Sequence, residues 1–395
     1  MNLARLTTQP ESFSRNRLRL SISLFYYAQG LCFASWASRI PEIKSQLGLS
    51  DAQFGSILLG LPLGQLVTMP LSGRLVTAYG SRRILTMVAP FYALALTNIG
   101  LVTAGWQLAL CLFFFGVVGN LCNISLNTQG VEAEKLYGSP IMTSFHGLWS
   151  LGGLSGALLG MGIVSLRLTP YTHFWLVTGL VWLHYLLNYR YLAPDQKPAP
   201  DAAVTKPKLF TMPQGVLIQL GIIGFCSMAT EGAMFDWSGV YFKEVVRAPA
   251  AYVVLGYASF MTMMTTGRLI GDRIILRYGR KRCLQYSGLL VSAGMFVSVC
   301  FPFLVPATLG FMLVGLGVSG VVPMVYSVAS HSDTTTIAPG MALAMVSGVS
   351  YFGFLLGPPL IGYVSAASSL QYSYAIIGCF GLCITLIVAK IRAIR

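Results

Sequence analysis

The chain has 395 residues, of which 55% are hydrophobic and 10% are charged, and its mean hydropathy is +0.69. This composition excludes an ordinary soluble globule and predicts an all-α polytopic membrane protein. The net charge of +14 does not indicate a nucleic-acid partner, because the basic residues fall in loops between apolar runs, where lipid and the insertion machinery favour them. The cysteines lack the spacing of a metal site, so we expect no metal, no disulfide and no cofactor.

Taken in order, the chain begins with a polar tail over residues 1–17 that lacks a signal-peptide cleavage pattern. Twelve apolar runs follow, each near the roughly 20 residues that a helix needs to cross a bilayer. A proline-rich linker at 193–213 separates a six-span half, 18–192, from a second half, 214–395. The predicted spans are 18–40, 53–76, 83–104, 107–129, 141–165, 171–191, 214–241, 250–271, 283–302, 304–328, 338–365 and 371–391.

The basic residues are distributed unequally across the predicted membrane. With a cytoplasmic N-terminus, 21 of the 26 Lys and Arg residues fall on the cytoplasmic side and 5 on the outer side. Loops rich in Lys and Arg stay in the cytoplasm during membrane insertion. We therefore expect both termini and the linker to be cytoplasmic.

The two halves of the chain repeat each other. Trp36 recurs as Trp237, an offset of 201 residues. The same offset relates three glycines of the fifth span to three of the eleventh: Gly147, Gly152 and Gly156 to Gly348, Gly353 and Gly357. Small residues at such spacings let helices approach closely, and their recurrence indicates a duplication. Two related halves with a site between them are typical of a transporter that alternates access.

Two loop motifs carry a family resemblance. Gly73-Arg74-Leu75 and Tyr79-Gly80-Ser81-Arg82-Arg83 follow the second span, and Gly267-Arg268-Leu269 and Tyr278-Gly279-Arg280-Lys281-Arg282 follow the eighth. These motifs resemble the loop signatures of the major facilitator superfamily. The stretches ASWASRIPEI, EGAMFDW and FHGLWSLGG are similar to its fucose-permease-like branch and that branch's uncharacterised bacterial inner-membrane relatives. The resemblance implies two pseudo-symmetric six-helix bundles, an inner-membrane location and, from that branch, proton-coupled sugar symport.

The sequence departs from the family pattern at three positions. The superfamily's loop aspartate is replaced by Thr77 in the first motif and by Leu276 in the second, where Asp272 lies one turn earlier. The fourth-helix glutamate that resembles a proton carrier in fucose permease aligns with Asn123. The resemblance therefore does not carry a proton site over to the fourth span.

Two carboxylates, Glu231 and Asp236, lie within the predicted span 214–241. A charge inside a bilayer costs at least about 3 kcal/mol, so such groups face a bundle interior or a wet cavity and usually serve function. The alternative is a carboxylate that only pairs with a neighbouring helix or reaches the interface. Burial favours the neutral form, so both are predicted proton-coupling residues, with Glu231 first.

Polar side chains in the other spans indicate what a cavity between the halves would bind. Amides that both donate and accept, beside aromatic rings, suit a neutral, hydroxyl-rich ligand. Such amides also bond helices to each other, and both roles stay open for Asn123 and Asn127. The predicted substrate-binding residues are Tyr27, Gln29, Asn123, Asn127, His146, Trp149, Glu231, Tyr257 and Tyr351.

Charged residues at the ends of the spans predict two gates. Arg39 and Asp236, at the outer ends of the first and seventh spans, are expected to pair when the cavity opens inward, because a guanidinium matches a carboxylate bidentately. Alternatively, Arg39 is an interfacial anchor. The predicted inner gate comprises Arg82, Arg83, Glu132, Asp272 and Arg280.

No phosphate-binding loop, zinc spacing or nucleophile elbow indicates an enzyme. The sequence predicts a monomeric secondary active transporter whose partners are a small-molecule substrate, protons and the lipid bilayer. Two functions stay open: proton-coupled uptake of a small polar solute such as a sugar or polyol, and proton-driven efflux of amphipathic or cationic compounds. The fifth span lacks the Gly-Pro pair typical of drug antiporters of this superfamily, which favours uptake.

Overall fold

The computed structural model describes residues 15–137, 141–195, 215–330 and 339–391, and the regular secondary structure of this part of the chain is helical throughout. Two single-turn 3₁₀ helices, η2 (Tyr189–Tyr191) and η3 (Ala250–Tyr252), accompany the α-helices. The α-helices are α1 (Arg15–Gln46), α2 (Asp51–Leu58), α3 (Gly60–Tyr79), α4 (Ser81–Ile99), α5 (Gly105–Tyr137), α6 (Met142–Ser165), α7 (Pro170–Asn188), α8 (Val216–Glu244), α9 (Leu255–Tyr278), α10 (Arg280–Cys300), α11 (Leu304–Val318), α12 (Val321–Ser330), α13 (Pro339–Ala367) and α14 (Leu370–Lys390).

These helices confirm the twelve predicted spans, two of which are interrupted. The second span consists of α2 and α3, and the tenth consists of α11 and α12. By length and composition alone, eight helical segments of the described chain are apolar enough to cross a membrane. The other four spans correspond to α1, α4, α7 and α9.

Short polar motifs determine where several helices begin. Ser50 and Gln53 form a reciprocal capping box at the start of α2, in which each side chain accepts a hydrogen bond from the other residue's backbone N–H. Thr169 caps α7, whose first residue is Pro170, and Ser369 caps α14. Such side chains satisfy the amide groups that the first turn of a helix leaves without partners. The loops between spans can therefore be short.

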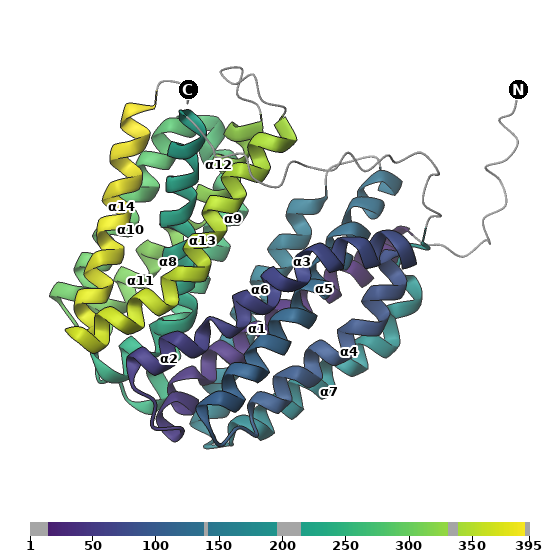
Figure 1. Cartoon of the computed structure of the whole chain (residues 1–395), viewed down its shortest axis with the longest axis horizontal. Coiled ribbons are helices and arrows are strands. Elements are labelled where there is room, and N and C mark those ends of the chain that lie inside the picture. Colours follow the sequence, from purple (N-terminus) through teal and green to yellow (C-terminus); the bar gives the residue numbers. More distant parts are fainter. Residues whose placement is uncertain (1–14, 138–140, 196–214, 331–338, 392–395) are drawn as a thin grey trace, which may run out of the picture.

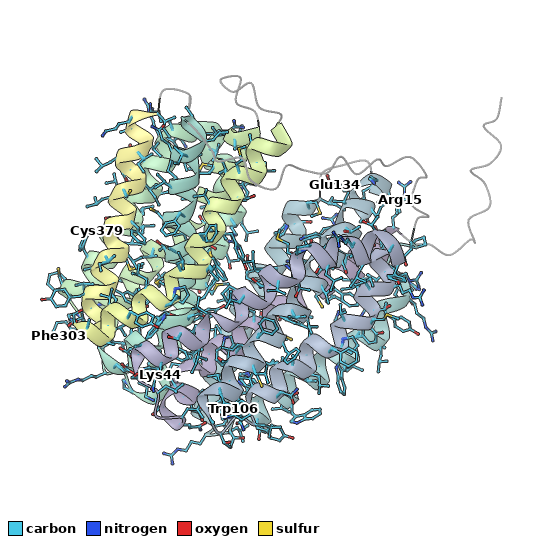
Figure 2. All side chains as sticks on the ribbon, in the orientation of Figure 1. Arg15, Lys44, Trp106, Glu134, Phe303 and Cys379 are labelled. Atoms are coloured by element: carbon cyan, nitrogen blue, oxygen red, sulfur yellow. The ribbon has the colours of Figure 1, made fainter. Side chains whose placement is uncertain are left out.

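The helices form two bundles, α1–α7 and α8–α14, whose ribbons meet at one end and diverge toward the other (Figure 1). Figure 2 places Lys44 and Trp106 at the end where the bundles meet, and Arg15 and Glu134 at the opposite end of the first bundle. We call these the Lys44 end and the Arg15 end.

One packing contact occurs in both bundles. A Cβ atom added at Gly152 of α6 would lie 2.1 Å from the Tyr27 carbonyl oxygen of α1. A Cβ atom added at Gly353 of α13 would lie 2.1 Å from the Phe225 carbonyl oxygen of α8. At such close approach between helix backbones there is room only for glycine. The recurring glycines therefore support equivalent helix pairs, as a duplication predicts.

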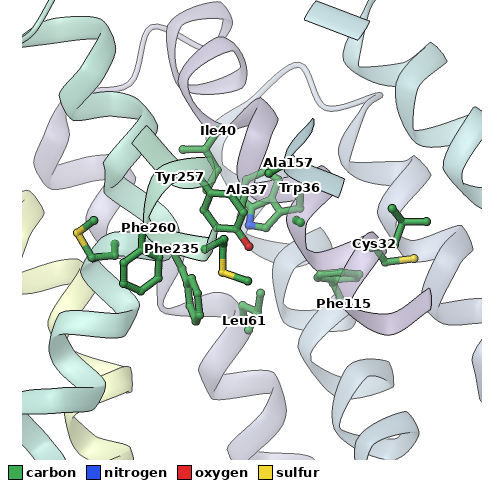
Figure 3. Packing of buried hydrophobic residues seen from close by; sticks show 14 of the residues in the cluster. Cys32, Trp36, Ala37, Ile40, Leu61, Phe115, Ala157, Phe235, Tyr257 and Phe260 are labelled. Atoms are coloured by element: carbon green, nitrogen blue, oxygen red, sulfur yellow. The ribbon is translucent and has the colours of Figure 1, made fainter. Parts of the chain in front are cut away.

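Apolar side chains join the bundles near the middle of the molecule. Figure 3 shows Phe235, Tyr257 and Phe260 of the second bundle close to Trp36 and Ala37 of α1. The Phe235 ring also meets the Phe33 ring edge-on, with centroids 5.3 Å apart. This contact belongs to one buried apolar cluster that extends across both bundles.

The predicted linker begins against the first bundle. Leu192 and Ala193 are buried, and Gln129 of α5 brackets Ala193 by accepting from its N–H at 2.8 Å and donating to its carbonyl at 3.1 Å. The linker is therefore anchored at its first residues, which its proline-rich composition did not predict. Residues 196–213 of the linker and 1–14 of the tail lie outside the described residues.

Candidate functional site

A cavity of about 710 Å³ lies between the two bundles. Its polar lining includes the amides Gln29, Gln65, Asn120 and Asn123, the carboxylate Glu231 and the hydroxyls of Tyr326, Ser347 and Tyr351. Aromatic rings complete it: Phe33, Tyr92, Phe115, Trp149, Phe235, Phe352 and Phe354. A few convergent polar groups within an aromatic wall are typical of a site for a small organic molecule.

Glu231 faces a cation inside this region. Its Oε1 lies 3.8 Å from Nη2 of Arg268 on α9, and Nη1 of the same Arg268 donates to the Ser150 hydroxyl of α6 at 3.1 Å. Arg268 therefore connects the acidic residue of one bundle to a helix of the other. Sequence analysis missed this role, because Arg268 belongs to a loop motif and was assigned to the cytoplasmic surface.

Five of the nine predicted substrate-binding residues line the cavity: Gln29, Asn123, Trp149, Glu231 and Tyr351. Tyr351 also spans the boundary between the bundles, where its hydroxyl lies 2.9 Å from the Pro62 carbonyl and 3.2 Å from Gln65 Oε1 of α3. It therefore joins α13 to α3 at the cavity wall.

The other four do not line the cavity in this conformation. Asn127 bonds helices together, since it accepts from the Tyr26 hydroxyl at 2.6 Å and donates to Asn123 at 2.9 Å. The Tyr257 side chain is buried in the contact between the bundles. Tyr27 packs its backbone against Gly152, and the His146 ring lies edge-on to Tyr26. For these residues, packing between helices describes the structure better than ligand contact.

Asp236 lies in a separate, much smaller cavity of about 10 Å³, among Trp36, Leu61, Pro358 and other apolar side chains. Phe33, Leu61 and Phe354 line both this cavity and the large one. No ion pair or hydrogen bond of the Asp236 carboxylate is found within the described part of the chain. An ionised carboxylate is costly in such surroundings, so the neutral form is favoured.

The predicted pairing of Arg39 with Asp236 is wrong for this conformation. The Arg39 guanidinium is buried within the first bundle, where it bonds Glu42, His173 Nδ1 and the Leu168 carbonyl. These partners satisfy all three guanidinium nitrogens. A carboxylate three residues along the same helix is a nearer partner than one on a helix of the other bundle.

Another charged network joins the bundles at the Lys44 end. Lys44 of α1, beyond the predicted span, lies 2.5 Å from Glu244 of α8 and 2.6 Å from Asp51 of α2. Asp51 also accepts from the Ser365 hydroxyl of α13. Burial alone would lower the pKa of Lys44, but its hydrogen bonds to Asp51 and Glu244 raise it above the ordinary value. Lys44 is therefore a cation at physiological pH.

The predicted inner-gate residues have different partners at the Arg15 end. The Asp195 carboxylate accepts from the backbone N–H groups of Arg82 at 2.7 Å and Arg83 at 3.2 Å, so it caps α4. Glu132, the expected partner of these arginines, pairs with Lys135 at 2.9 Å. Arg280 is exposed at the start of α10, and the Asp272 side chain lies outside the described part of the structure.

Comparisons with known proteins agree with this geometry. The family model described as "Major Facilitator Superfamily" matches residues 20–336. An uncharacterized MFS-type transporter of Yersinia pestis is 31% identical over 376 residues, which cover 95% of each chain. The solved structure of the nucleoside transporter NupG matches with a TM-score of 0.75 at 15% identity, covering 94% of this chain and 99% of NupG. An inward-facing, unoccupied bacterial homolog of the human lysosomal transporter Spinster matches with a TM-score of 0.71 at 13% identity, covering 96% of each chain.

Proposed function

This chain belongs to the Major Facilitator Superfamily and is a membrane transporter rather than an enzyme, and we propose that it takes up a small polar solute together with protons. The observation that carries this proposal is the cavity between the bundles, in which four amides surround a carboxylate. Such a lining can donate to and accept from several hydroxyl groups at once. A sugar, polyol or nucleoside has the matching chemistry. The narrower likeness to the fucose-permease-like branch stays a prediction.

The Glu231–Arg268 pair favours this solute class over a cationic compound. A cationic drug needs a carboxylate whose charge is available, and the charge of Glu231 is opposed by a guanidinium 3.8 Å away. The pair leaves this wall of the cavity with little net charge. Proton-driven efflux of amphipathic or cationic compounds therefore remains only the second candidate.

We assign proton coupling first to Asp236 and solute binding to Glu231, which reverses their order in the sequence analysis. Arg268 favours the ionised form of Glu231, because an opposite charge nearby stabilises it. Asp236 has no such partner among the described residues and lies close to the large cavity through shared aromatic walls. A group that is neutral when enclosed and ionised when wet can load a proton on one side and release it on the other.

The orientation follows from the charge bias of the loops. With both termini and the linker in the cytoplasm of the inner membrane, the Lys44 end faces outward and the diverging ends of the bundles face inward. The conformation described here is then open to the cytoplasm. The units that move against each other are residues 18–192 and 214–395, within a monomer.

The proposal is tested with purified protein in two steps. A thermal-shift screen against sugars, polyols, nucleosides, organic acids and cationic dyes should identify a polar solute that raises the melting temperature, since a ligand stabilises the state that binds it. Proteoliposomes with an acidic exterior should then accumulate this solute, and a proton ionophore should abolish accumulation. Stabilisation by cationic dyes alone, with export driven by the gradient, would replace this proposal with the efflux function.

A further inference from the structure

A second cavity, of about 490 Å³, lies at the Lys44 end, and its lining shares no residue with that of the central cavity. One wall comes from the first bundle, through the end of α1 and the loop after α6. The other wall comes from the second bundle, through Lys243 and residues between 248 and 254. This cavity exists only while the two bundles are together at this end.

The second cavity carries a net positive charge. Its lining includes the cations Arg39, Arg167 and Lys243 and one carboxylate, Glu42. Arg39 is 1% exposed and bonded on all three nitrogens, so it contributes charge rather than a free donor. Lys243 is exposed and donates to the Pro41 carbonyl at 3.0 Å, which leaves further ammonium protons for a ligand.

Arg167 holds its place at a cost. Its φ is +57°, in the left-handed region where an L side chain is strained by about 1 kcal/mol or more and glycine is not. The residue lies just past α6, where its N–H donates to the Val164 carbonyl at 2.9 Å. Its guanidinium has no hydrogen-bond or ion-pair partner among the residues that the structure describes. A strained position that carries a long cation beside a positive cavity indicates that the cation is used there.

We propose that this cavity binds a small soluble anion of the phosphate or carboxylate class, and that the bound anion holds the Lys44 end closed. Arg167 reaches the anion from the first bundle and Lys243 from the second. Because the walls separate when the bundles move apart, the anion binds the closed state better and shifts the population toward it. With the orientation proposed above, the anion acts from the outer solution and inhibits the return of the empty carrier to the outward-open state.

The headgroup of an anionic lipid offers the same oxygens as a free phosphate, so the experiment separates the two sources. The purified full chain is placed in nanodiscs of phosphatidylcholine alone or with phosphatidylglycerol, and inorganic pyrophosphate is titrated calorimetrically at constant ionic strength. Pyrophosphate should bind in phosphatidylcholine nanodiscs. Phosphatidylglycerol should leave this affinity nearly unchanged.

The chain offers a matched control for Arg167. Arg247 also has a positive φ, +55°, is exposed at the Lys44 end and does not line the cavity. Both Arg167→Gly and Arg247→Gly remove one charge and one strained residue. Only Arg167→Gly should weaken pyrophosphate binding, by about tenfold for a lost charge-assisted contact, whereas Arg167→Lys should retain most of the affinity.

Three outcomes would overturn the proposal. The first is an absence of pyrophosphate binding to the unaltered chain. The second is equal loss in Arg167→Gly and Arg247→Gly, which would mean that surface charge rather than this cavity attracts the anion. The third is loss of binding in nanodiscs with phosphatidylglycerol, which would assign the cavity to a lipid headgroup. None of these readouts requires transport, so they are independent of the proposed function.

Discussion

Lys44 and Glu244 form an ion pair of 2.5 Å across the boundary between the two bundles. The Lys44 side chain is only 7% exposed and is shared with Asp51 of its own bundle. Exposed ion pairs contribute little, but a buried cation between two carboxylates cannot lose its partners without cost. This network is the strongest charged connection between α1 and α8, and it lies at the end where the bundles meet.

Replacing Lys44 should loosen that end. In Lys44→Met, Asp51 and Glu244 repel each other, and we expect a cost of about 1–2 kcal/mol to the closed state, a factor of roughly 5–30 in population. Spin labels at Trp106→Cys and Phe303→Cys, in a chain without its native cysteines, report the distance between the bundles. Both positions are well exposed. The longer distance should become more populated.

Lys135→Met provides the control for Lys44→Met. Lys135 also pairs with a carboxylate, Glu132, but both residues lie on α5 and the lysine is 63% exposed. Its loss should leave the label distances as in the unaltered chain. A distance distribution for Lys44→Met that matches the one for Lys135→Met would refute a gating role for Lys44.

Asp236→Asn tests the proton assignment. An amide occupies the same small cavity in a permanently neutral form, so the closed state should remain accessible. Uptake driven by a proton gradient should be lost, while exchange of labelled for unlabelled solute should continue. Transport assays in proteoliposomes, with and without an imposed pH gradient, measure both. If Asp236→Asn still accumulates solute against its gradient, the proton site is elsewhere, with Glu231 next.

Glu231 and Arg268 should act as a pair in solute binding and as opposed charges in stability. Glu231→Gln leaves Arg268 facing a neutral amide, so the melting temperature should fall. The double variant Glu231→Gln, Arg268→Gln should recover part of that loss, because it leaves neither charge unpaired. Solute affinity should stay low in both. Unaltered affinity in the double variant would remove the pair from the substrate site.

The fold could be predicted from sequence because its causes are local or repeated. Apolar length gives the spans, loop charge gives the proposed orientation, and the glycine spacing gives the equivalent contacts of Gly152 and Gly353. The interruption between α11 and α12 left no comparable signal. An apolar run has the same composition whether or not its helix is continuous.

The site was predicted only in part, because side-chain pairing depends on which helix faces meet. Sequence analysis expected an ion pair between the outer ends of the first and seventh spans, and the structure has one there. The residues are Lys44 and Glu244 rather than Arg39 and Asp236. Arg39 has nearer partners in its own bundle, which spacing along one sequence cannot exclude. Arg268 was missed because charge near a loop was assigned to the membrane surface.

The proposed orientation of the linker is tested by chemical labelling. A cysteine at Pro200→Cys, in the predicted linker, should not react with a membrane-impermeant thiol reagent added to intact cells. A cysteine at Trp106→Cys, between the third and fourth spans and well exposed, should react. Both variants need a background without native cysteines. Labelling of Pro200→Cys from outside would reverse the orientation.

The last prediction compares two equivalent glycines. Gly80 and Gly279 precede α4 and α10 with φ values of +90° and +80°. Alanine at either position is strained by about 1–3 kcal/mol, because only glycine adopts this backbone freely. An added Cβ at Gly279 meets nothing within 4 Å, whereas at Gly80 it would lie 2.0 Å from Cγ of Asp195. Gly80→Ala must therefore also displace the carboxylate that caps α4.

Gly80→Ala should lower the free energy of unfolding more than Gly279→Ala does, by about 0.5–2 kcal/mol, the contribution of a helix cap. Asp195→Ala should cost about as much as that difference. The two changes remove one interaction, so Gly80→Ala with Asp195→Ala should cost less than the sum of the single variants. Melting temperatures of the purified variants, in one detergent, measure all four. Equal shifts for Gly80→Ala and Gly279→Ala would show that Asp195 does not stabilise the start of α4, and that the linker is held by Gln129 alone.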